Sequence, residues 1–158
     1  MSTTSGPSKK IKRTIGRSDL ADFPELGLED VAIKIDTGAY TSSIHCHRIE
    51  VERDDEGRAQ IAFALLDPSH EQYNEQVYRS RRFTQRDIKN SFGTSETRYV
   101  IETDIRLFGK THPIELSLSE RGEMKFPVLI GRRFLSRKYL VDPDRRNLSH
   151  KHKAKRSR

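Results

Sequence analysis

An alternating apolar segment runs into an acidic turn at Val31-Ala32-Ile33-Lys34-Ile35-Asp36-Thr37-Gly38-Ala39. Val31, Ile33 and Ile35 share one face, which predicts a strand with one buried side. The strand runs directly into an acid, a hydroxyl and a glycine. A carboxylate at the end of a buried strand is costly to hold unless the site uses or satisfies it. We therefore interpret Asp36 as a candidate acid–base residue on a rigid element. The alternative is a turn aspartate that accepts backbone hydrogen bonds.

A second motif lies far downstream and reads Phe126-Pro127-Val128-Leu129-Ile130-Gly131-Arg132. The residues between the two motifs form short alternating segments with turn signals, such as Asp54-Asp55-Glu56-Gly57, which predict a mainly β domain. Residues 79–88 are expected to pair with residues 96–107 across a turn. A short helix is expected after Gly131, followed by a last strand at residues 139–141.

Together the two motifs resemble the retropepsin-type aspartic proteases. Lys34 to Ala39, followed by Thr41, Ser42 and His45, is similar to one bacterial family with the older label "ATP-dependent zinc protease". The resemblance covers most of residues 14–148 and includes residues 24–28, 114–118 and 140–143. It implies a single-domain acid-protease (retropepsin-like) β-barrel with one short C-terminal helix and one half-site per chain. Tyr40 departs from the basic residue expected in many relatives, which bears on substrate preference.

The reaction of this family needs two carboxylates that share a proton across a bound water. The chain has one Asp-Thr-Gly, at residues 36–38, and no Asp-Ser-Gly. On this resemblance Asp36 meets its partner in a second copy of the chain, which predicts a homodimer. The predicted function is an aspartic endopeptidase in the cytoplasm. Acidic or glutamate-tailed proteins are one substrate option, because relatives are associated with a ligase that adds glutamates to a ribosomal protein. No cofactor is expected.

The resemblance assigns three groups of site residues. The catalytic group is Asp36, Thr37 and Gly38. Ala39 and Tyr40 are expected to bind substrate, with a candidate flap at Asn90, Ser91, Phe92 and Gly93; an ordinary surface hairpin is the alternative for the flap. Structural support is expected from Leu129, Ile130, Gly131 and Arg132.

The residues around Cys46 suggest two other chemistries, a zinc site and a cysteine nucleophile. His45 and His47 share one strand face, but a zinc site needs a third ligand from elsewhere, and no His-Glu-x-x-His is present. We expect no metal, although a zinc-dependent peptidase is a stated alternative. Cys46 beside two histidines leaves a cysteine nucleophile formally open. No phosphate-binding Gly-x-x-x-x-Gly-Lys-Ser/Thr loop occurs.

Basic residues gather at the two ends of the chain. The net charge is +7 over 158 residues, yet residues 18–144 hold 18 basic and 23 acidic residues, a net charge of −5. We predict a basic disordered arm at 1–13, a protease domain at 14–144 and a basic disordered tail at 145–158. The arms are either solvated ends or binding segments for nucleic acid or a ribosome surface. A non-catalytic dimeric module that binds RNA is therefore the second functional alternative. No membrane span is expected, and one cysteine without a signal-peptide core favours the cytoplasm.

Overall fold

The computed structural model describes residues 11–66, 70–73, 75–89, 92–120 and 126–156. Within these ranges the protein is mainly β, as predicted. Two short helices are present: α1 (Arg132–Leu135) and α2 (Leu148–Arg156). The strands are β1 (Arg13–Ile15), β2 (Ser18–Phe23), β3 (Leu28–Ile35), β4 (Ser42–Arg53), β5 (Ala59–Leu65), β6 (Val77–Ser80), β7 (Phe83–Lys89), β8 (Ser95–Leu107), β9 (Lys110–Ser119), β10 (Val128–Ile130) and β11 (Tyr139–Val141).

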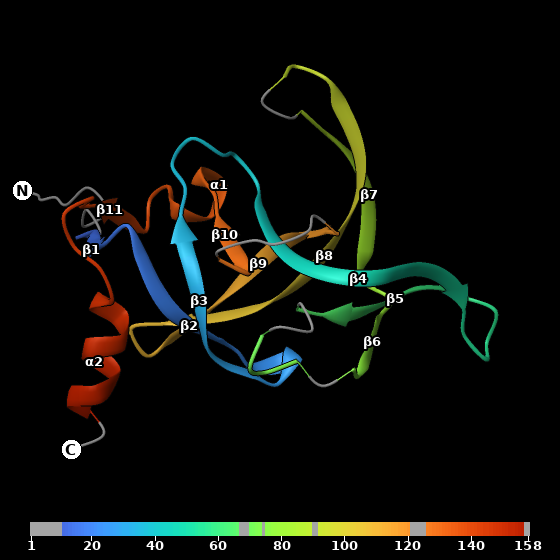
Figure 1. The fold of residues 1–158 in the computed structure, drawn as a ribbon, viewed down its shortest axis with the longest axis horizontal. Helices are drawn as coiled ribbons and strands as arrows, with labels where there is room; N and C mark the ends of the chain where they lie inside the picture. The colour runs from blue at the N-terminus through green and yellow to red at the C-terminus, as the bar shows by residue number, and fades with distance from the viewer. Residues whose placement is uncertain (1–10, 67–69, 74, 90–91, 121–125, 157–158) are drawn as a thin grey trace, which may run out of the picture.

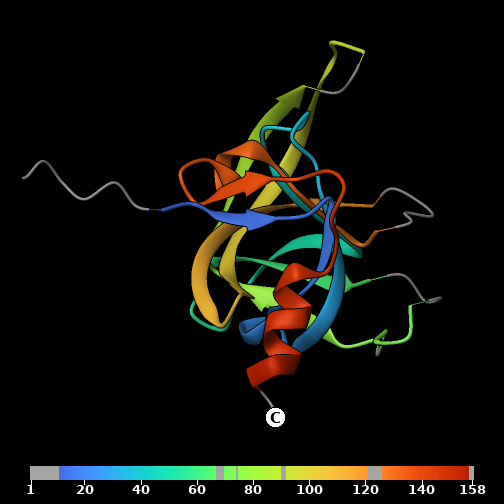
Figure 2. The same ribbon diagram turned by 90° about the vertical axis from the view of Figure 1, so that its left-hand side faces the viewer.

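The two sequence motifs lie side by side in one sheet. Nine strands pair in the order β10-β3-β2-β8-β9-β4-β5-β6, with β7 on β8, and β10 also pairs with β4. Because β10 is parallel to β3, Ile130 lies opposite Ile35, the last residue before Asp36. A separate two-stranded sheet joins β1 to β11 (Figures 1 and 2). The arrangement places the end of β3 beside the start of α1.

The core follows the alternation of the sequence. Val31 and Ile33 are fully buried and Ile35 is nearly so, while Lys34 between them is exposed. This confirms the predicted one-sided strand. Burying the apolar face of β3 against Ile130 and its neighbours fixes the position at which the chain turns into Asp36, because apolar burial is the main favourable term in folding.

One predicted strand is divided in the structure. Residues 79–88 do not form a single strand: β6 ends at Ser80 and pairs with β5, whereas β7 begins at Phe83 and pairs with β8. Between them the backbone N–H of Arg82 donates to the Ser80 hydroxyl at 3.1 Å. Such a side-chain bond replaces a ladder bond and turns the chain. The predicted pairing of this region with residues 96–107 is correct for β7 alone.

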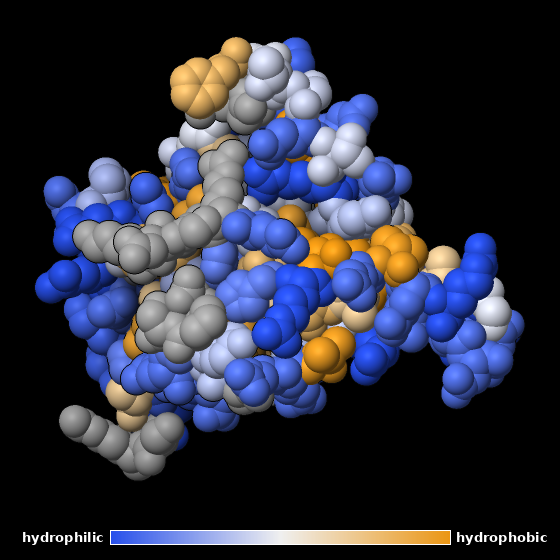
Figure 3. All heavy atoms as spheres, turned by 45° about the vertical axis from the view of Figure 1, so that its right-hand side comes forward, coloured by the Kyte–Doolittle hydropathy of each residue, from blue (hydrophilic) through white to orange (hydrophobic). Residues whose placement is uncertain are grey.

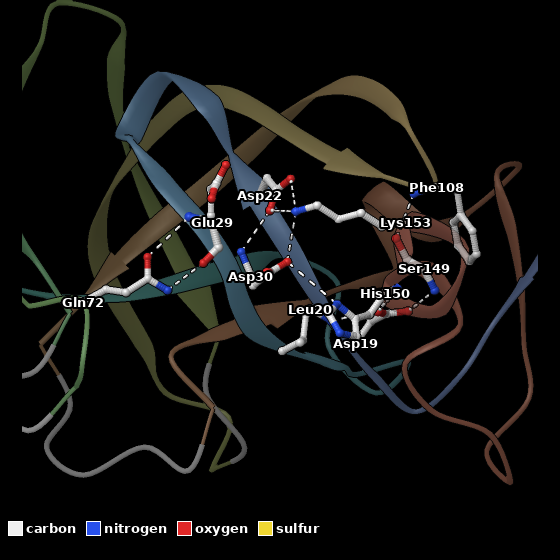
Figure 4. Close-up of polar contacts among 10 residues, drawn as sticks. All are labelled: Asp19, Leu20, Asp22, Glu29, Asp30, Gln72, Phe108, Ser149, His150 and Lys153. Carbon is white, nitrogen blue, oxygen red and sulfur yellow. Dashed lines mark hydrogen bonds and ion pairs between the residues drawn. The ribbon is translucent and has the colours of Figure 1, made fainter. Parts of the chain in front are cut away.

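The second helix was not predicted. Residues 148–156 form α2 where the charge run indicated a disordered tail and where the fold prediction allowed only one short helix. A residue of another element stabilises the first turn of α2. Buried Asp19 of β2 accepts hydrogen bonds from the backbone N–H groups of Ser149 at 2.8 Å and His150 at 3.1 Å. Lys153 adds ion pairs at 3.1 Å to each of two carboxylates, Asp22 and Asp30 (Figure 4). These contacts with distant residues order a segment whose polar, highly charged composition alone predicts disorder.

Neither helix within the described stretches has the length and apolar character needed to cross a bilayer. The predicted N-terminal arm lies mostly outside the described residues. The proposed division of the chain at 13 and 144 stays a prediction.

Candidate functional site

The Asp36 turn is fixed by backbone bonds to the second motif. The N–H of Asp36 donates to the carbonyl of Ile130 at 2.8 Å. The Asp36 carboxylate accepts a bond from the N–H of Gly38 at 3.1 Å, and the Asp36 carbonyl accepts one from Ala39 at 3.1 Å. The side chain is half-buried, with room for solvent or a ligand. The carboxylate is therefore presented at the end of β3 on a rigid support.

Gly131 is the residue that lets the two motifs meet. A Cβ atom there would lie 2.6 Å from the carbonyl oxygens of both Tyr40 and Thr41, too close for any side chain. Its N–H donates to the Ser42 hydroxyl at 3.0 Å. Gly38, by contrast, has only the Asp36 carboxylate within reach, at 3.4 Å. The sequence motif singled out both glycines, but close packing requires only the downstream one.

The first residues of α1 continue this contact. The N–H groups of Arg132 and Arg133 donate to the carbonyls of Ala39 at 2.8 Å and Tyr40 at 3.0 Å. The guanidinium of Arg132 also donates to the Thr37 carbonyl at 3.2 Å and stands 5.7 Å from the centre of the Tyr40 ring. Arg132 therefore stabilises the Asp36 turn from the cleft side rather than lying free on the surface.

A cleft of about 840 Å³ opens beside Asp36. It lies between the Asp36 turn and the hairpin of β7 and β8, which rise on the same side of the molecule (Figure 1). On the face shown in Figure 3, hydrophilic residues predominate around a smaller hydrophobic patch. The lining residues are Asp36, Gly38, Ala39, Tyr40, Thr41, Ser43, Arg86, Asp87, Ile88, Lys89, Glu96, Arg98, Ser117, Ser119, Leu129, Arg132 and Arg133. Asp36, Gly38, Ala39 and Tyr40 of the first motif thus line one cavity with Leu129 and Arg132 of the second. The predicted residues Thr37, Ile130 and Gly131 are not part of this lining.

Only two residues of the candidate flap, Phe92 and Gly93, lie within the described structure, between β7 and β8. Asn90 and Ser91 lie outside the described residues. Phe92 is 90% exposed, and neither it nor Gly93 lines the cleft. The hairpin contributes instead through its strands, with Arg86 to Lys89 of β7 and Glu96 and Arg98 of β8. The sequence did not predict the cleft cations Arg98 and Arg133, because no local pattern marks them.

Positive charge exceeds negative charge in this cleft. Five cationic side chains line it, against three carboxylates. Two of the carboxylates are already engaged: Glu96 pairs with Arg98 at 2.6 Å, and Asp87 accepts a bond from the Thr97 hydroxyl at 2.9 Å. Residues 18–144 as a whole carry a net charge of −5. The cations in the cleft lining therefore exceed the carboxylates by two, and two of these cations, Arg86 and Arg133, also pair with Glu115 just outside this lining.

The other chemistries gain no support from the geometry. The rings of His45 and His47 are 5.6 Å apart on β4, and no group of three His, Cys, Asp or Glu side chains within the described ranges is arranged to hold a metal ion. Cys46 is fully buried, and burial raises its pKa to about 12. Its thiol is protonated at neutral pH and shielded, which makes it a poor nucleophile.

Three comparisons bear on this site. The RimB-like family model, described as retropepsin-like aspartic endopeptidase RimB, matches residues 14–152. A relative from Desulfotalea psychrophila is 38% identical over 84% of this chain, and one from Shewanella pealeana is 37% identical over 84%. A crystal structure of a protein of unknown function from Legionella pneumophila superposes with a TM-score of 0.68 at 20% identity, covering 87% of this chain and 98% of that chain.

The names of the relatives correct the predicted function. Relatives at 35–38% identity are named probable alpha-L-glutamate ligase, not aspartic endopeptidase. The chain spans only 28–29% of the length of these proteins. They indicate an enzyme without fixing the reaction of this chain.

The family that the motifs predicted is nevertheless confirmed, without the zinc label. With 139 of its residues inside the family model, positions 14 to 152, this chain belongs to the RimB-like family of retropepsin-like proteins.

Proposed function

We propose that this chain binds glutamate-bearing peptides in the cleft beside Asp36, as the peptide-holding part of an α-L-glutamate ligation system. The observation that carries the proposal is the cationic lining of the cleft. Each glutamate of a peptide carries a carboxylate at neutral pH, since its pKa lies near 4.3. A cleft with five cations and three carboxylates attracts such a peptide and repels a cationic one.

The ligase-named relatives support the same ligand. The part of those proteins that matches this chain is less than a third of their length. A role that suits a segment of this length is to hold the glutamate-bearing substrate or product. That role needs a shaped, charged cleft and no nucleotide site.

The shape of the site suits an extended peptide. The cleft runs between the Asp36 turn on one side and the strands β7 and β8 on the other. Lys89 and Arg98 come from the hairpin, whereas Arg132 comes from α1, so cations lie on opposing walls. Two walls of cations can contact carboxylates on alternate sides of an extended chain, because successive side chains point in opposite directions.

Asp36 is half-buried in the lining of this cleft, whereas the other two acids, Asp87 and Glu96, are exposed. The family description names an endopeptidase, and Asp36 is the residue that such a reaction would use. Mass spectrometry of the peptide, described below, reports hydrolysis separately from binding. Asp36→Asn removes one negative charge from the cleft. We therefore expect this variant to bind a glutamate peptide at least as tightly as the wild type.

The test is fluorescence anisotropy with a labelled hexaglutamate peptide and its hexaglutamine counterpart. The wild type should bind the glutamate peptide, bind the glutamine peptide at least ~10-fold more weakly, and lose affinity as salt is raised. Mass spectrometry of the recovered peptide reports shortening or extension, with Asp36→Asn as the matched variant. Equal affinity for the two peptides would contradict the proposal.

A further inference from the structure

A smaller cavity of about 270 Å³ adjoins the cleft, and we call it the side pocket. It shares four lining residues with the cleft: Thr41, Arg86, Ser117 and Arg133. Its remaining lining comes from Ser42, Val100, Glu102, Pro113, Ile114, Glu115, Phe134 and Lys138. A side chain projecting from a peptide in the cleft can therefore enter the side pocket past Arg86 and Arg133.

Glu115 of β9 holds the two arginines at this boundary. One carboxylate oxygen of Glu115 pairs with Arg86 of β7, and the other lies 2.9 Å from a guanidinium nitrogen of Arg133 of α1. All three side chains are partly exposed, from 30% to 50%. Each guanidinium carries five N–H donors in a fixed fork, so donors remain for a second carboxylate.

The side chains that line the side pocket carry a net charge of +1, which favours the binding of one more anion. Arg86, Arg133 and Lys138 face the two carboxylates of Glu102 and Glu115, which leaves one positive charge in excess. Glu102 and Glu115 lie directly opposite each other on β8 and β9. Like charges at opposite positions destabilise a sheet unless cations compensate them. A single incoming carboxylate would neutralise the cluster.

The walls also match the stem of a carboxylate side chain. Val100, Ile114 and Phe134 are buried apolar residues that line the pocket. Lys138 covers the Phe134 ring, with its ammonium 4.7 Å from the ring centre. Methylene groups can pack against this apolar wall while the carboxylate meets the arginines. Glutamine has the same stem without the charge.

We infer that the side pocket is a subsite for a single glutamate side chain, that Arg86 and Arg133 bind its carboxylate, and that Glu115 is their positioning residue. This inference rests on the proposed binding of glutamate peptides in the cleft. It adds a claim of location: one position of the peptide is recognised much more strictly than the others.

The experiment uses six hexaglutamate peptides, each with one glutamate replaced by glutamine, in the anisotropy assay. For the wild type, replacement at one position should weaken binding about tenfold, the scale of a lost charge-assisted hydrogen bond, against about twofold elsewhere. In Arg133→Gln that position should become no more sensitive than the rest. Lys89→Ala is the control, because Lys89 lines the cleft but not the side pocket. This variant should weaken all six peptides and keep the sensitive position.

Glu115→Gln separates positioning from simple charge. Removing a carboxylate should strengthen binding of an acidic peptide if only net charge matters. We expect instead that Glu115→Gln abolishes the strict position, because Arg86 and Arg133 lose their common partner. Glu102→Gln is matched to it, since it removes the same charge from the same pocket but from a residue outside the Glu115 ion pairs. It should keep the strict position and bind more tightly.

The outcomes are distinguishable. Absence of any binding of hexaglutamate to the wild type would overturn the proposed function. Binding with even sensitivity at all six positions, or a strict position that survives both Arg133→Gln and Glu115→Gln, would overturn the side-pocket inference and leave the cleft proposal standing. A thermal melt of each variant checks that the fold is intact.

Discussion

Asp36 and Ile130, which lie in different sequence motifs, are joined by a backbone hydrogen bond of 2.8 Å from the Asp36 N–H to the Ile130 carbonyl. This bond extends the parallel pairing of β3 and β10 by one step into the turn. The position of the carboxylate therefore depends on the downstream motif as much as on its own strand. Gly131, the next residue, must be a glycine because the carbonyl oxygens of Tyr40 and Thr41 lie against it.

The two motif glycines should respond differently to alanine. In Gly131→Ala the new Cβ would lie 2.6 Å from two carbonyl oxygens, so the Asp36 turn and α1 must move apart. We expect a loss of about 1–3 kcal/mol in the free energy of unfolding, the usual range for overpacking. In Gly38→Ala the nearest atom is 3.4 Å away, an ordinary contact, and the loss should stay within about 0.5 kcal/mol. Urea denaturation measures both; equal losses would contradict this account of the turn.

We expect Asp19 to stabilise α2 mainly because its oxygens accept hydrogen bonds, and less because it is charged. Its carboxylate accepts bonds from Leu20, Ser149 and His150. Burial nevertheless raises the pKa of Asp19 above its ordinary value of 3.8, against the opposing effect of these bonds. We expect Asp19→Ala to cost about 1–3 kcal/mol by leaving buried N–H groups unpaired. Asp19→Asn, which keeps an acceptor and removes the buried charge, should cost less.

The raised pKa of Asp19 also predicts a pH dependence. The native protein binds this proton more tightly than the unfolded chain, so the stabilisation is complete below pH 3.8 and is lost as pH rises through the native pKa. The stability difference between wild type and Asp19→Asn should therefore favour the wild type more at pH 4 than at pH 7. Denaturant titrations at both pH values measure it, because other groups cancel in the difference. If the wild type were instead more favoured over Asp19→Asn at pH 7 than at pH 4, the pKa of Asp19 would not be raised in the native protein.

Cys46 should be unreactive in the native protein. It is fully buried, and its pKa is raised to about 12. We expect an aromatic disulfide reagent to modify it only at the rate at which the structure opens, and to react at once in denaturant. Rapid modification of the folded protein would contradict the burial of β4. It would also reopen the cysteine chemistry that the neighbouring His45 and His47 suggest.

The nucleic-acid partner expected for the basic ends stays a prediction, and α2 changes how it is tested. Deleting residues 145–158 would also remove the helix that Asp19 holds, so charge reversal is the cleaner change. Lys151 and Lys155 are exposed on α2. Reversing both to glutamate should reduce RNA affinity and its dependence on salt. Reversing two exposed cations elsewhere, Lys34 of β3 and Arg58 in the turn between β4 and β5, should not. An unchanged salt dependence would remove α2 from the RNA prediction.

Much of the fold follows from local patterns. The alternation of Val31, Ile33 and Ile35 predicted β3, and the family resemblance assigned Gly131 and its neighbours as structural support for the Asp36 site. Local patterns could not predict α2, because its anchor Asp19 lies 130 residues from Ser149. They could not reveal the side pocket either, since Arg86, Glu115 and Arg133 come from three separate elements and meet only through the sheet register.

Function was harder to predict than fold for a related reason. The Asp36 motif indicates a family, and that part of the prediction is confirmed. The peptidase function inferred from it does not agree with the names of the ligase relatives. A single carboxylate on a rigid turn is compatible with several roles. The charges that surround it, from β7, β8 and α1, determine which ligand it meets.

The most direct test of the central claim is where a glutamate peptide binds. We would titrate unlabelled hexaglutamate into ¹⁵N-labelled protein and follow backbone amide shifts. The account predicts saturable shifts around the cleft, at Gly38, Arg98 and Arg132, with little change at Lys151 and Lys155 of α2. Shifts confined to α2, or spread evenly over every basic surface, would contradict it, because they would show attraction to charge without a peptide-binding cleft.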